Sequence, residues 1–258
     1  MLRVLSVAFR PPSPTELTIL IGIEDASEIN NLIALCAPMI KVKASEKHAS
    51  EVTFVNETVE HNTRYQAAKL FDISEDSLED WQSDPRVKQF HGVLTWRCYS
   101  HIEALNSASS GTRDGDDEPT PTSTVKARQS ASTKSKADCS YPSEHWLLHA
   151  MKGKPEFSED LVGDIPTFWE QNSPERALWL REYLKEDSTL KHEGMTALHV
   201  AAAFGYESLT STLLNRGHGG ELKATNKSEY TPVSAKYRVK YHPKFKAQAD
   251  FNSYMSRL

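Results

Sequence analysis

Histidines have the clearest potential for chemistry in this chain, because imidazole nitrogens bind metals and exchange protons near neutral pH. The sequence contains 10 of them. Glu57 and His61 stand four positions apart, as do His145 and His149, so each pair could share one face of a helix. A metal site needs three or four converging ligands, and no third ligand is indicated for either pair. We therefore interpret the histidines as surface or packing residues and expect no metal and no cofactor.

Other patterns typical of catalysis are missing from the sequence. No serine lies in a G-x-S-x-G elbow, and no G-x-x-x-x-G-K-[ST] loop is present to cradle phosphates. The acidic clusters at 114–118 and 156–160 are more typical of solvated surface than of acid–base machinery. We expect that the chain is not an enzyme and has no small-molecule substrate. A hydrolase with an unrecognised site is the alternative from another class.

Composition indicates a protein of the reducing cytosol. Cys36, Cys98 and Cys139 are few and widely spaced, which fits neither a disulfide framework nor a zinc site. The net charge of −5 argues against a nucleic-acid partner held by bulk electrostatics. The longest apolar stretch, Leu17–Ile23, is too short to span a bilayer, and Met1–Phe9 lacks a signal-peptide cleavage pattern. We therefore expect a cytoplasmic protein without a membrane or nucleic-acid partner.

Five segments differ in composition. Residues 1–103 alternate apolar runs with turn signals, whereas residues 104–140 lose every aromatic side chain and fill with small polar, charged and proline residues. The second segment has too little apolar surface to offset the entropy of ordering, which predicts a disordered linker. A helical connector is expected at 141–190, one good and one degenerate ankyrin repeat at 191–235, and a basic irregular tail at 236–258.

The first segment is predicted to be helical with one small hairpin. Ser13 followed by Pro14 is typical of a capped helix start. Two alternating runs, 39–43 and 51–55, flank a polar stretch and predict a β-hairpin. Apolar spacing predicts helices at 2–9, 14–21, 27–37, 57–70 and 85–101. Helices followed by a hairpin suggest a winged-helix-like unit, in a chain that is mainly α.

The connector is predicted to hold three helical pieces. His145–Lys152 and Thr167–Gln171 have helical spacing, and Ser173 caps a stronger helix that runs from 174 to 184. Large aromatic side chains in this segment are more typical of a core than of a ligand-stacking site. They are Trp146, Phe168, Trp169 and Trp179.

The most specific motif runs from Gly194 to Gly217. It is very similar to the ankyrin repeat, in which a T-P-L-H-x-A turn opens two antiparallel helices. Thr196 and His199 are placed to bind backbone groups at the start of the first helix, and Gly205 is placed to end it. The repeat-defining residues are expected to serve stacking rather than chemistry: Gly194, Thr196, Leu198, His199, Ala201, Ala202, Gly205, Leu213, Leu214 and Gly217.

A second turn at 226–233 follows the first at nearly the same spacing. Thr196 to Thr231 is 35 residues, close to the ankyrin period of about 33. The pattern fails there, with Glu229 in place of the turn glycine, Ser234 in place of histidine and Lys236 in place of a packing alanine. One repeat and a half is too little for independent stability. Either the preceding helices cap the repeat or the array is cut short.

Short motifs occur in order before the ankyrin run: Met1–Leu5 with Arg10–Leu17, Ile29–Val42, Val52–Val59, His91–Ile102 and Tyr141–Ala150. The motif at 52–59 is similar to V-x-F-V-H-x-[ST]-V, with Asn56 where histidine is usual, and the last is similar to Y-P-x-x-x-W-x-x-H-A. Together they resemble the region between the NACHT core and the repeats of fungal NACHT-ankyrin proteins, which are NOD-like members of the STAND class of signalling ATPases. The resemblance implies a winged-helix region and places nucleotide binding in a module upstream of residue 1.

The resemblance also implies a function. In that family the winged-helix region transmits nucleotide state, and the repeats bind a ligand or hold the protein inactive. We therefore expect a non-catalytic protein-interaction and signal-regulatory fragment with an unidentified protein partner. The expected contact face, on the turn tips and the first repeat helix, is lined by Met195, Ala197, Val200, Phe204 and Tyr206. A truncated or degenerate gene product without independent activity is a further alternative.

Overall fold

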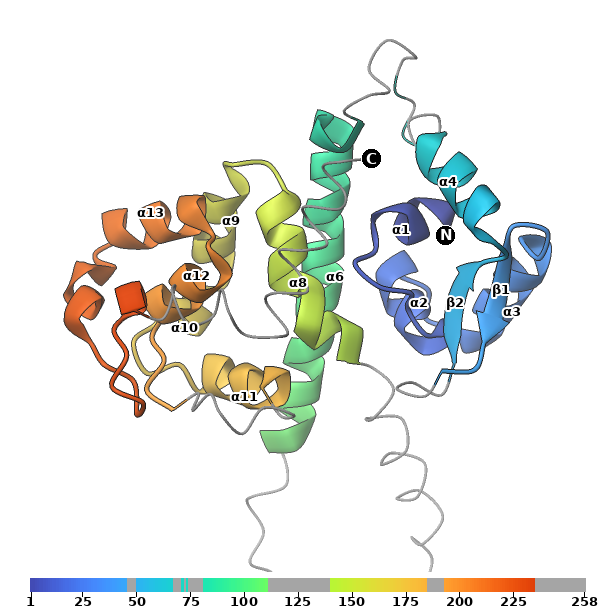
Figure 1. The fold of residues 1–258 in the computed structure, drawn as a ribbon. Helices are drawn as coiled ribbons and strands as arrows, with labels where there is room; N and C mark the ends of the chain where they lie inside the picture. The colour runs from blue at the N-terminus through green and yellow to red at the C-terminus, as the bar shows by residue number, and fades with distance from the viewer. Residues whose placement is uncertain are drawn as a thin grey trace, which may run out of the picture. The chain divides into compact units, whose positions relative to one another are not determined.

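The computed structural model describes residues 1–45, 50–66, 71, 73, 81–110, 140–184 and 193–234. Two compact units form, Met1–Lys154 and Pro155–Leu258. Both are mainly helical, as the sequence predicts, and a two-stranded antiparallel sheet accompanies the helices of the first unit (Figure 1). The division falls within the predicted connector 141–190. The first predicted helix of that segment therefore belongs to the N-terminal unit, and its other predicted helices belong to the C-terminal unit.

The N-terminal unit begins with short helices and a hairpin. In chain order these are α1 (Leu2–Val7), α2 (Pro14–Ile21), α3 (Ala26–Leu35), β1 (Ile40–Lys43), β2 (Glu51–Phe54) and α4 (Glu57–Tyr65). The strands pair antiparallel, with Ile40 opposite Phe54 and Val42 opposite Val52. The predicted hairpin is thus confirmed. The part of the predicted helix at 67–70 lies outside the described residues.

Helix α2 shows why its sequence starts and stops a helix. The Ser13 side chain accepts a hydrogen bond from the Glu16 amide at 3.1 Å, and the Glu16 carboxylate accepts one from the Ser13 amide at 2.8 Å. This reciprocal capping box satisfies two amides that a helix start leaves unpaired. At the other end Gly22 adopts φ 78°, and Arg97 donates to the Leu20 carbonyl at 2.6 Å.

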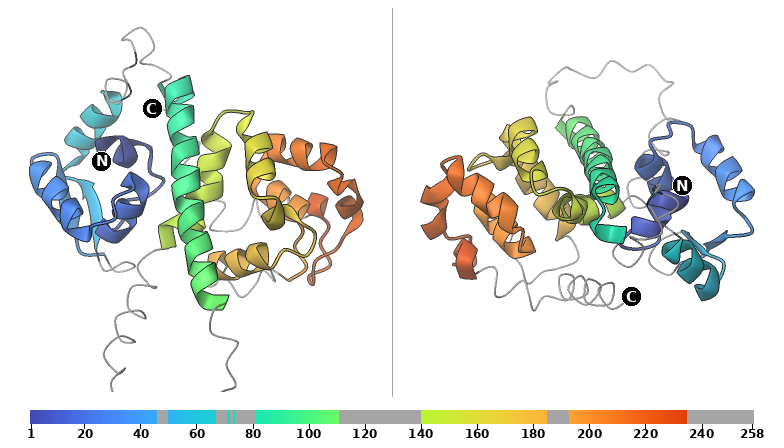
Figure 2. Two further views of the ribbon diagram at one scale, coloured as in Figure 1. Left: turned by 180° about the vertical axis from the view of Figure 1, so that it is seen from behind. Right: turned by 90° about the horizontal axis from the view of Figure 1, so that it is seen from above.

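Two long helices, α6 (Pro85–Ser110) and α8 (Ser140–Lys152), pack along each other in the N-terminal unit (Figure 2). Leu94, Cys98 and Trp146 are fully buried in this unit. The described part of α6 runs to Ser110, so the helix extends into the predicted linker 104–140, where each added residue can add a backbone hydrogen bond. Residues 111–139 lie outside the described part of the chain.

The second unit consists of short helices. They are α9 (Phe157–Asp164), α10 (Pro166–Trp169), α11 (Pro174–Tyr183), α12 (Ala197–Phe204), α13 (Glu207–Asn215) and the 3-10 helix η2 (His218–Lys223). Helix α9 is not predicted from the sequence, where its acidic start suggests only solvated surface. Glu159 and Asp160 are indeed exposed, but Leu161 and Val162 are buried. Only the buried side of α9 packs, against α13 and α10.

Aromatic side chains fill the core of the second unit. Phe168, Trp169 and Trp179 are each 1% exposed, and the Trp169 indole donates to the Leu161 carbonyl at 3.1 Å. Ring centroids of Phe168 and Trp179 lie 5.7 Å apart, within the range of favourable aromatic pairs. The interpretation of these aromatics as core residues is therefore confirmed.

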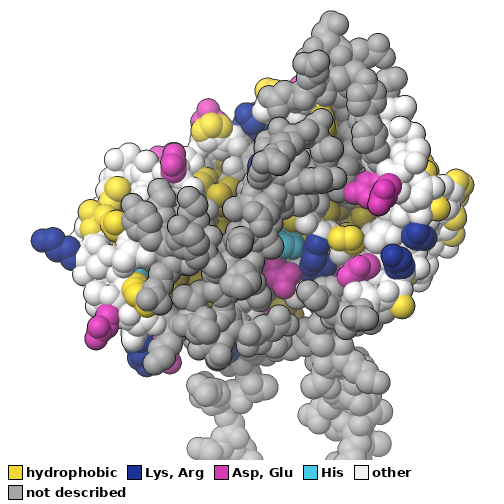
Figure 3. Space-filling model, in the orientation of Figure 1, with side chains coloured by type: hydrophobic (Ala, Val, Ile, Leu, Met, Phe, Trp, Pro, Cys, Tyr) yellow, Lys and Arg dark blue, Asp and Glu magenta, His cyan; other side chains and the backbone are white. Residues whose placement is uncertain are grey.

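Some apolar side chains remain at the surface of the N-terminal unit. Leu35 at the end of α3 is 78% exposed and Val42 on β1 is 49% exposed. Figure 3 shows apolar side chains reaching the surface at the edge where α3 and the hairpin lie in Figure 1. Within the described ranges, no helix combines the length and the apolar character needed to cross a membrane.

Adjacent residues of α6 provide a test of the packing. Leu94 is fully buried, whereas Val93 is 40% exposed. We expect Leu94→Ala to lower the free energy of unfolding by about 2–5 kcal/mol, because it removes buried methyl groups and leaves a cavity. Val93→Ala should change it by less than about 1 kcal/mol. Urea denaturation followed by circular dichroism measures both, and equal effects would contradict the assigned face of α6.

Candidate functional site

The start of α12 is held by contacts between Thr196 and His199. The Thr196 amide donates to His199 Nδ1 at 3.2 Å, and Thr196 Oγ1 lies 2.9 Å from the same nitrogen. Since Nδ1 accepts, the proton of the neutral imidazole lies on Nε2, which donates to the Tyr230 carbonyl at 2.7 Å. Burial lowers the pKa of His199, which favours this neutral form. Both residues therefore lie at the turn and contact backbone groups there.

The two turns of the ankyrin-like segment contact each other directly. The Lys227 amide donates to the Glu193 carbonyl at 3.0 Å, and their side chains form an exposed ion pair of 2.8 Å. Gly194 lies between them with φ 78°, and a Cβ at this position would come within 3.3 Å of the Asn226 Cα. Glycine thus serves both the left-handed backbone and the close approach of the second turn.

The second turn keeps its geometry despite its departures in sequence. Glu229, in the place of the turn glycine, adopts φ 61°, close to the 78° of Gly194. The Thr231 amide donates to Ser234 Oγ at 2.9 Å, and the Ser234 amide donates to Thr231 Oγ1 at 3.4 Å. A serine hydroxyl therefore replaces the imidazole in the reciprocal cap. Glu229 and Ser234 depart from the expected pattern in sequence but keep the turn geometry, and Lys236 lies outside the described residues.

A buried arginine supports the first turn from α11. Arg176 is 2% exposed and donates to three carbonyls, those of Phe168 at 2.5 Å, Gln171 at 2.9 Å and Met195 at 3.3 Å. Burial lowers its pKa to about 10, and the charge of Glu221 opposes that shift. The guanidinium therefore stays charged at neutral pH and ties the chain before α12 to α10 and α11.

Glu221 of η2 supports the same turn from the other side. Its carboxylate is buried and accepts from the Leu198 amide at 3.2 Å, close to the positive end of α12. The other oxygen lies 2.7 Å from His218 Nδ1. The first turn of α12 is thus stabilised by a carboxylate that no ankyrin motif in the sequence indicates.

Most of the expected contact residues are not on the surface. Ala197 and Val200 are 0% exposed and Tyr206 is 5% exposed, so these three cannot contact a partner as expected. Met195 and Phe204 are half-buried. The reason is that α12 packs against both α13 and η2, which covers most of its surface.

Aromatic side chains of α11 cover part of the Phe204 ring. Its ring centroid lies 6.1 Å from that of Trp179 and 5.6 Å from that of Tyr183, both on α11. Aromatic packing of this kind stabilises the hairpin. Helix α11 thus contacts the side chain that the sequence assigns to the binding face.

The repeat-defining residues divide into buried and exposed groups. Leu198, Ala201 and Leu213 are buried, Ala202 is half-buried, and Leu214 is 37% exposed. The expectation that Leu214 belongs to the buried stripe is wrong, because neighbouring residues of a helix point about 100° apart. Positive φ values at the ends of α12 and α13 belong to Gly205 (67°) and Gly217 (98°).

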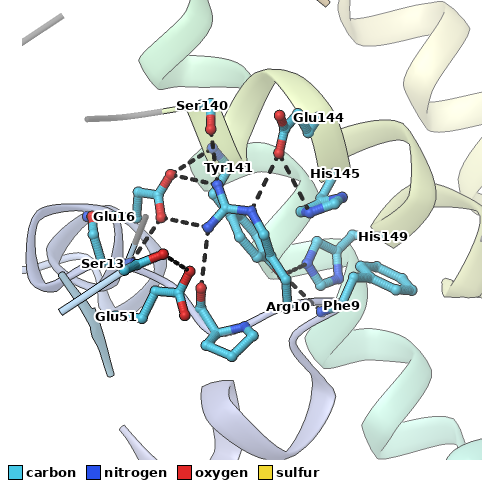
Figure 4. Close-up of polar contacts among 12 residues, drawn as sticks. Phe9, Arg10, Ser13, Glu16, Glu51, Ser140, Tyr141, Glu144, His145 and His149 are labelled. Atoms are coloured by element: carbon cyan, nitrogen blue, oxygen red, sulfur yellow. Dashed lines mark hydrogen bonds and ion pairs between the residues drawn. The ribbon is translucent and has the colours of Figure 1, made fainter. Parts of the chain in front are cut away.

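A second cluster, of which the sequence indicates only the capping spacing of Ser13 and Glu16, lies in the N-terminal unit (Figure 4). Glu16 is fully buried, and its two carboxylate oxygens accept from the Arg10 guanidinium at 2.7 and 2.9 Å. The Tyr141 amide donates to the same carboxylate at 2.7 Å, in addition to the capping contact from Ser13. Glu16 therefore joins the start of α2 to the start of α8. Tyr141 is already part of α8, so the helix extends further toward the N-terminus than the predicted start at His145.

Arg10 is satisfied on every side of this cluster. It donates to Glu144 at 3.2 Å and to Ser140 at 2.9 Å, and it lies 5.1 Å from the centre of the Tyr141 ring. Burial would lower the pKa of Arg10, but the hydrogen bond and charge of Glu16 outweigh it and raise that pKa. The Arg10 guanidinium therefore stays charged at neutral pH.

The two residue pairs considered for metal binding end in different surroundings. His145 and His149 share helix α8, and His149 is fully buried. Glu57 begins α4 and is exposed, and the side chain of His61 lies outside the described residues. Among the described residues, no group of three or more His, Cys, Asp and Glu side chains could hold a metal ion.

One sequence signal pointed to the cluster around Glu16: the Ser13-x-x-Glu16 spacing of a capping box, with Arg10 just before it.

Two glutamates on Arg10 test the buried ion pair. We expect Glu16→Gln to lower the free energy of unfolding by about 3–5 kcal/mol, because it removes the fully buried carboxylate and leaves Arg10 with only the partly exposed Glu144 as counter-charge. Glu144→Gln should cost less than about 1 kcal/mol, since the Glu144 side chain is 29% exposed. Thermal and urea denaturation of the two variants measure the difference. An equal loss would show that Glu16 is not the central partner.

Glu229, the residue with a left-handed backbone in the second turn, leads to a prediction of increased stability. We expect Glu229→Gly to raise the stability of the C-terminal unit by about 1 kcal/mol, because glycine adopts a positive φ without the Cβ penalty. Ser228→Gly is the matched control, since Ser228 has no positive φ and gains only disorder when unfolded. Denaturant midpoints give the answer, and a destabilised Glu229→Gly would contradict the assigned turn.

Comparison with protein-family models gave no match, and searches of curated proteins and of solved structures gave none either. The two clusters are therefore interpreted from their own geometry.

Proposed function

We propose that the chain is a non-catalytic protein-interaction and signal-regulatory segment of a cytoplasmic NACHT-ankyrin type protein. The N-terminal unit would be its winged-helix-like part, and the C-terminal unit would begin its repeat array. The contact between consecutive turns carries this proposal: Lys227 binds the Glu193 carbonyl, and His199 of the first turn binds the Tyr230 carbonyl of the second. Direct bonding between successive turns is what a stacked repeat array requires.

The proposed contact surface differs from the one expected from sequence. The exposed turn tips, with Glu193, Lys227 and Glu229, replace the buried residues of α12. Met195 stays in the set because it is half-buried beside the first turn. A turn edge with both charges and one adaptable apolar side chain suits a protein partner better than a small molecule, which needs a concave apolar site.

Two apolar-to-glutamate changes test this surface. Met195→Glu alters the turn edge, whereas Leu222→Glu alters an exposed apolar residue of η2 (43% exposed). The full chain and each variant are immobilised and incubated with cell extract, and bound proteins are quantified by mass spectrometry. We expect a specific partner that Met195→Glu loses at least about tenfold and that Leu222→Glu retains, a difference of about 1.4 kcal/mol in binding.

Circular dichroism melting of each variant serves as the folding control. The interaction proposal would be contradicted if the wild-type chain folds cooperatively but enriches no protein. It would also be contradicted if both variants retain the partner equally. A wild-type chain that neither melts cooperatively nor binds a partner would instead favour a truncated or degenerate gene product.

A further inference from the structure

Three buried side chains form a continuous hydrogen-bonded chain in the N-terminal unit. The Phe9 amide donates to Tyr141 Oη at 3.2 Å, Tyr141 Oη lies 3.0 Å from His149 Nε2, and His149 Nδ1 lies 2.8 Å from His91 Nδ1. Tyr141 and His149 belong to α8 and His91 belongs to α6. This row of hydrogen bonds therefore ends on the backbone amide of Phe9, in the segment that follows α1. Tyr141, His149 and the ring of Phe9 are visible together in Figure 4.

The distances determine where each proton lies. Two Nδ1 atoms at 2.8 Å need one hydrogen between them, so one imidazole donates and the other accepts. The buried Tyr141 hydroxyl also has one hydrogen to donate, and among its partners in the described residues only His149 Nε2 can accept it, so we assign the hydrogen to that contact. His149 is then protonated at Nδ1 and donates to His91, whose proton lies on Nε2. All contacts are satisfied only when both imidazoles are neutral.

A further proton would break this arrangement. On His91 it would place two N–H groups face to face at Nδ1, and on His149 it would deprive the tyrosine hydroxyl of its acceptor. The surroundings cannot compensate, because His149 and Tyr141 are 0% exposed and His91 is 7% exposed. The Phe9 ring also covers them, with its centroid 4.7 Å from that of His149.

The charged and titratable groups around the chain come from each neighbouring element. Arg10 and Glu16 lie on the N-terminal segment and α2, Cys98 lies on α6, and Glu144, His145 and Lys152 lie on α8. Burial, and then the charge of Lys152, lowers the pKa of His91 to about 3. Burial, followed by the neighbouring histidines, holds the pKa of His149 well below its usual range, and burial and Arg10 do the same for His145.

We propose that the His91–His149–Tyr141 chain is an acid-sensitive latch that holds Phe9 against α6 and α8, and that protonation of either histidine releases the segment around Phe9. This latch lies in the N-terminal unit and goes beyond the proposed partner binding, which concerns the C-terminal unit.

The direction of the pH effect follows from proton linkage. Both histidines have a lower pKa in the closed form than the ordinary value near 6.5, so the open form binds more protons below that pH. The latch is therefore at full strength above about pH 6.5 and weakens as the pH falls. Each histidine that takes up a proton on opening changes the opening equilibrium about tenfold per pH unit, which gives up to about 100-fold per unit for the pair.

Amide hydrogen exchange of the full chain between pH 7.5 and 5.0 tests the latch. The Phe9 amide is the reporter, the Leu94 amide in α6 reports unfolding of the whole unit, and rates are corrected for intrinsic exchange. We expect the protection of Phe9 to fall at least about tenfold per pH unit below pH 6 and to lie below that of Leu94 throughout, because global unfolding takes up the same protons but costs more free energy than local opening. Protection of Phe9 that is independent of pH, or that equals that of Leu94 at every pH, would overturn the proposal.

A variant separates the latch from other acid effects. In His91→Asn the side-chain oxygen can still accept from His149 Nδ1 but takes up no proton, so the pH dependence at Phe9 should drop by about tenfold per unit. His101→Asn, also on α6, should leave it unchanged. Both variants retain Glu16 and Glu144, so these carboxylates are the same in the comparison. An unchanged pH dependence in His91→Asn would contradict the latch.

The wild-type chain offers a test that needs no variant. Nitrogen-15 spectra of the imidazoles at pH 7 distinguish the two neutral tautomers. We expect His149 protonated at Nδ1 and His91 at Nε2, with neither titrating near pH 6.5. The same tautomer in both, or an ordinary titration near 6.5 in either, would overturn the proposal even if His91→Asn fails to fold.

Discussion

A charge removed from water must be surrounded by donors or acceptors, and this constraint governs the N-terminal unit. Glu16 is the centre of that arrangement, because its carboxylate accepts from Arg10, Ser13 and Tyr141. These partners come from the chain before α2, from the helix cap and from the start of α8. The same carboxylate thus caps the start of α2 and binds the backbone of α8. The histidine chain lies directly beside it, since Tyr141 takes part in both.

In the C-terminal unit, buried polar side chains are also surrounded by partners, and the main examples are the neutral His199 and the charged Arg176. His199 accepts from its own turn and donates to the next, so one imidazole links consecutive turns. The bonds of Arg176 to backbone carbonyls perform the same task for the chain that enters the first turn.

Local patterns predicted much of the secondary structure. The capping spacing at Ser13, the alternating runs of the hairpin and the helix after Ser173 all form as expected, because each depends on residues close in sequence. Helix α9 was not predicted, because its polar start precedes two buried residues, Leu161 and Val162. The contact of the α8 backbone with Glu16 was not predicted either, because the two are distant in sequence.

The sequence by itself determined local features, namely the cap of α2, the paired runs of the hairpin and the glycines after α12 and α13, since caps, glycines and alternation act over a few residues. Only the tertiary structure decided which faces are buried. Val200 and Tyr206 fit an exposed face by pattern but lie beneath neighbouring elements, and Leu214 fits a buried stripe but reaches solvent. Burial depends on what packs against a helix, and no local spacing encodes that. For the same reason, the meeting of His91 and His149 from two helices could emerge only from the folded chain.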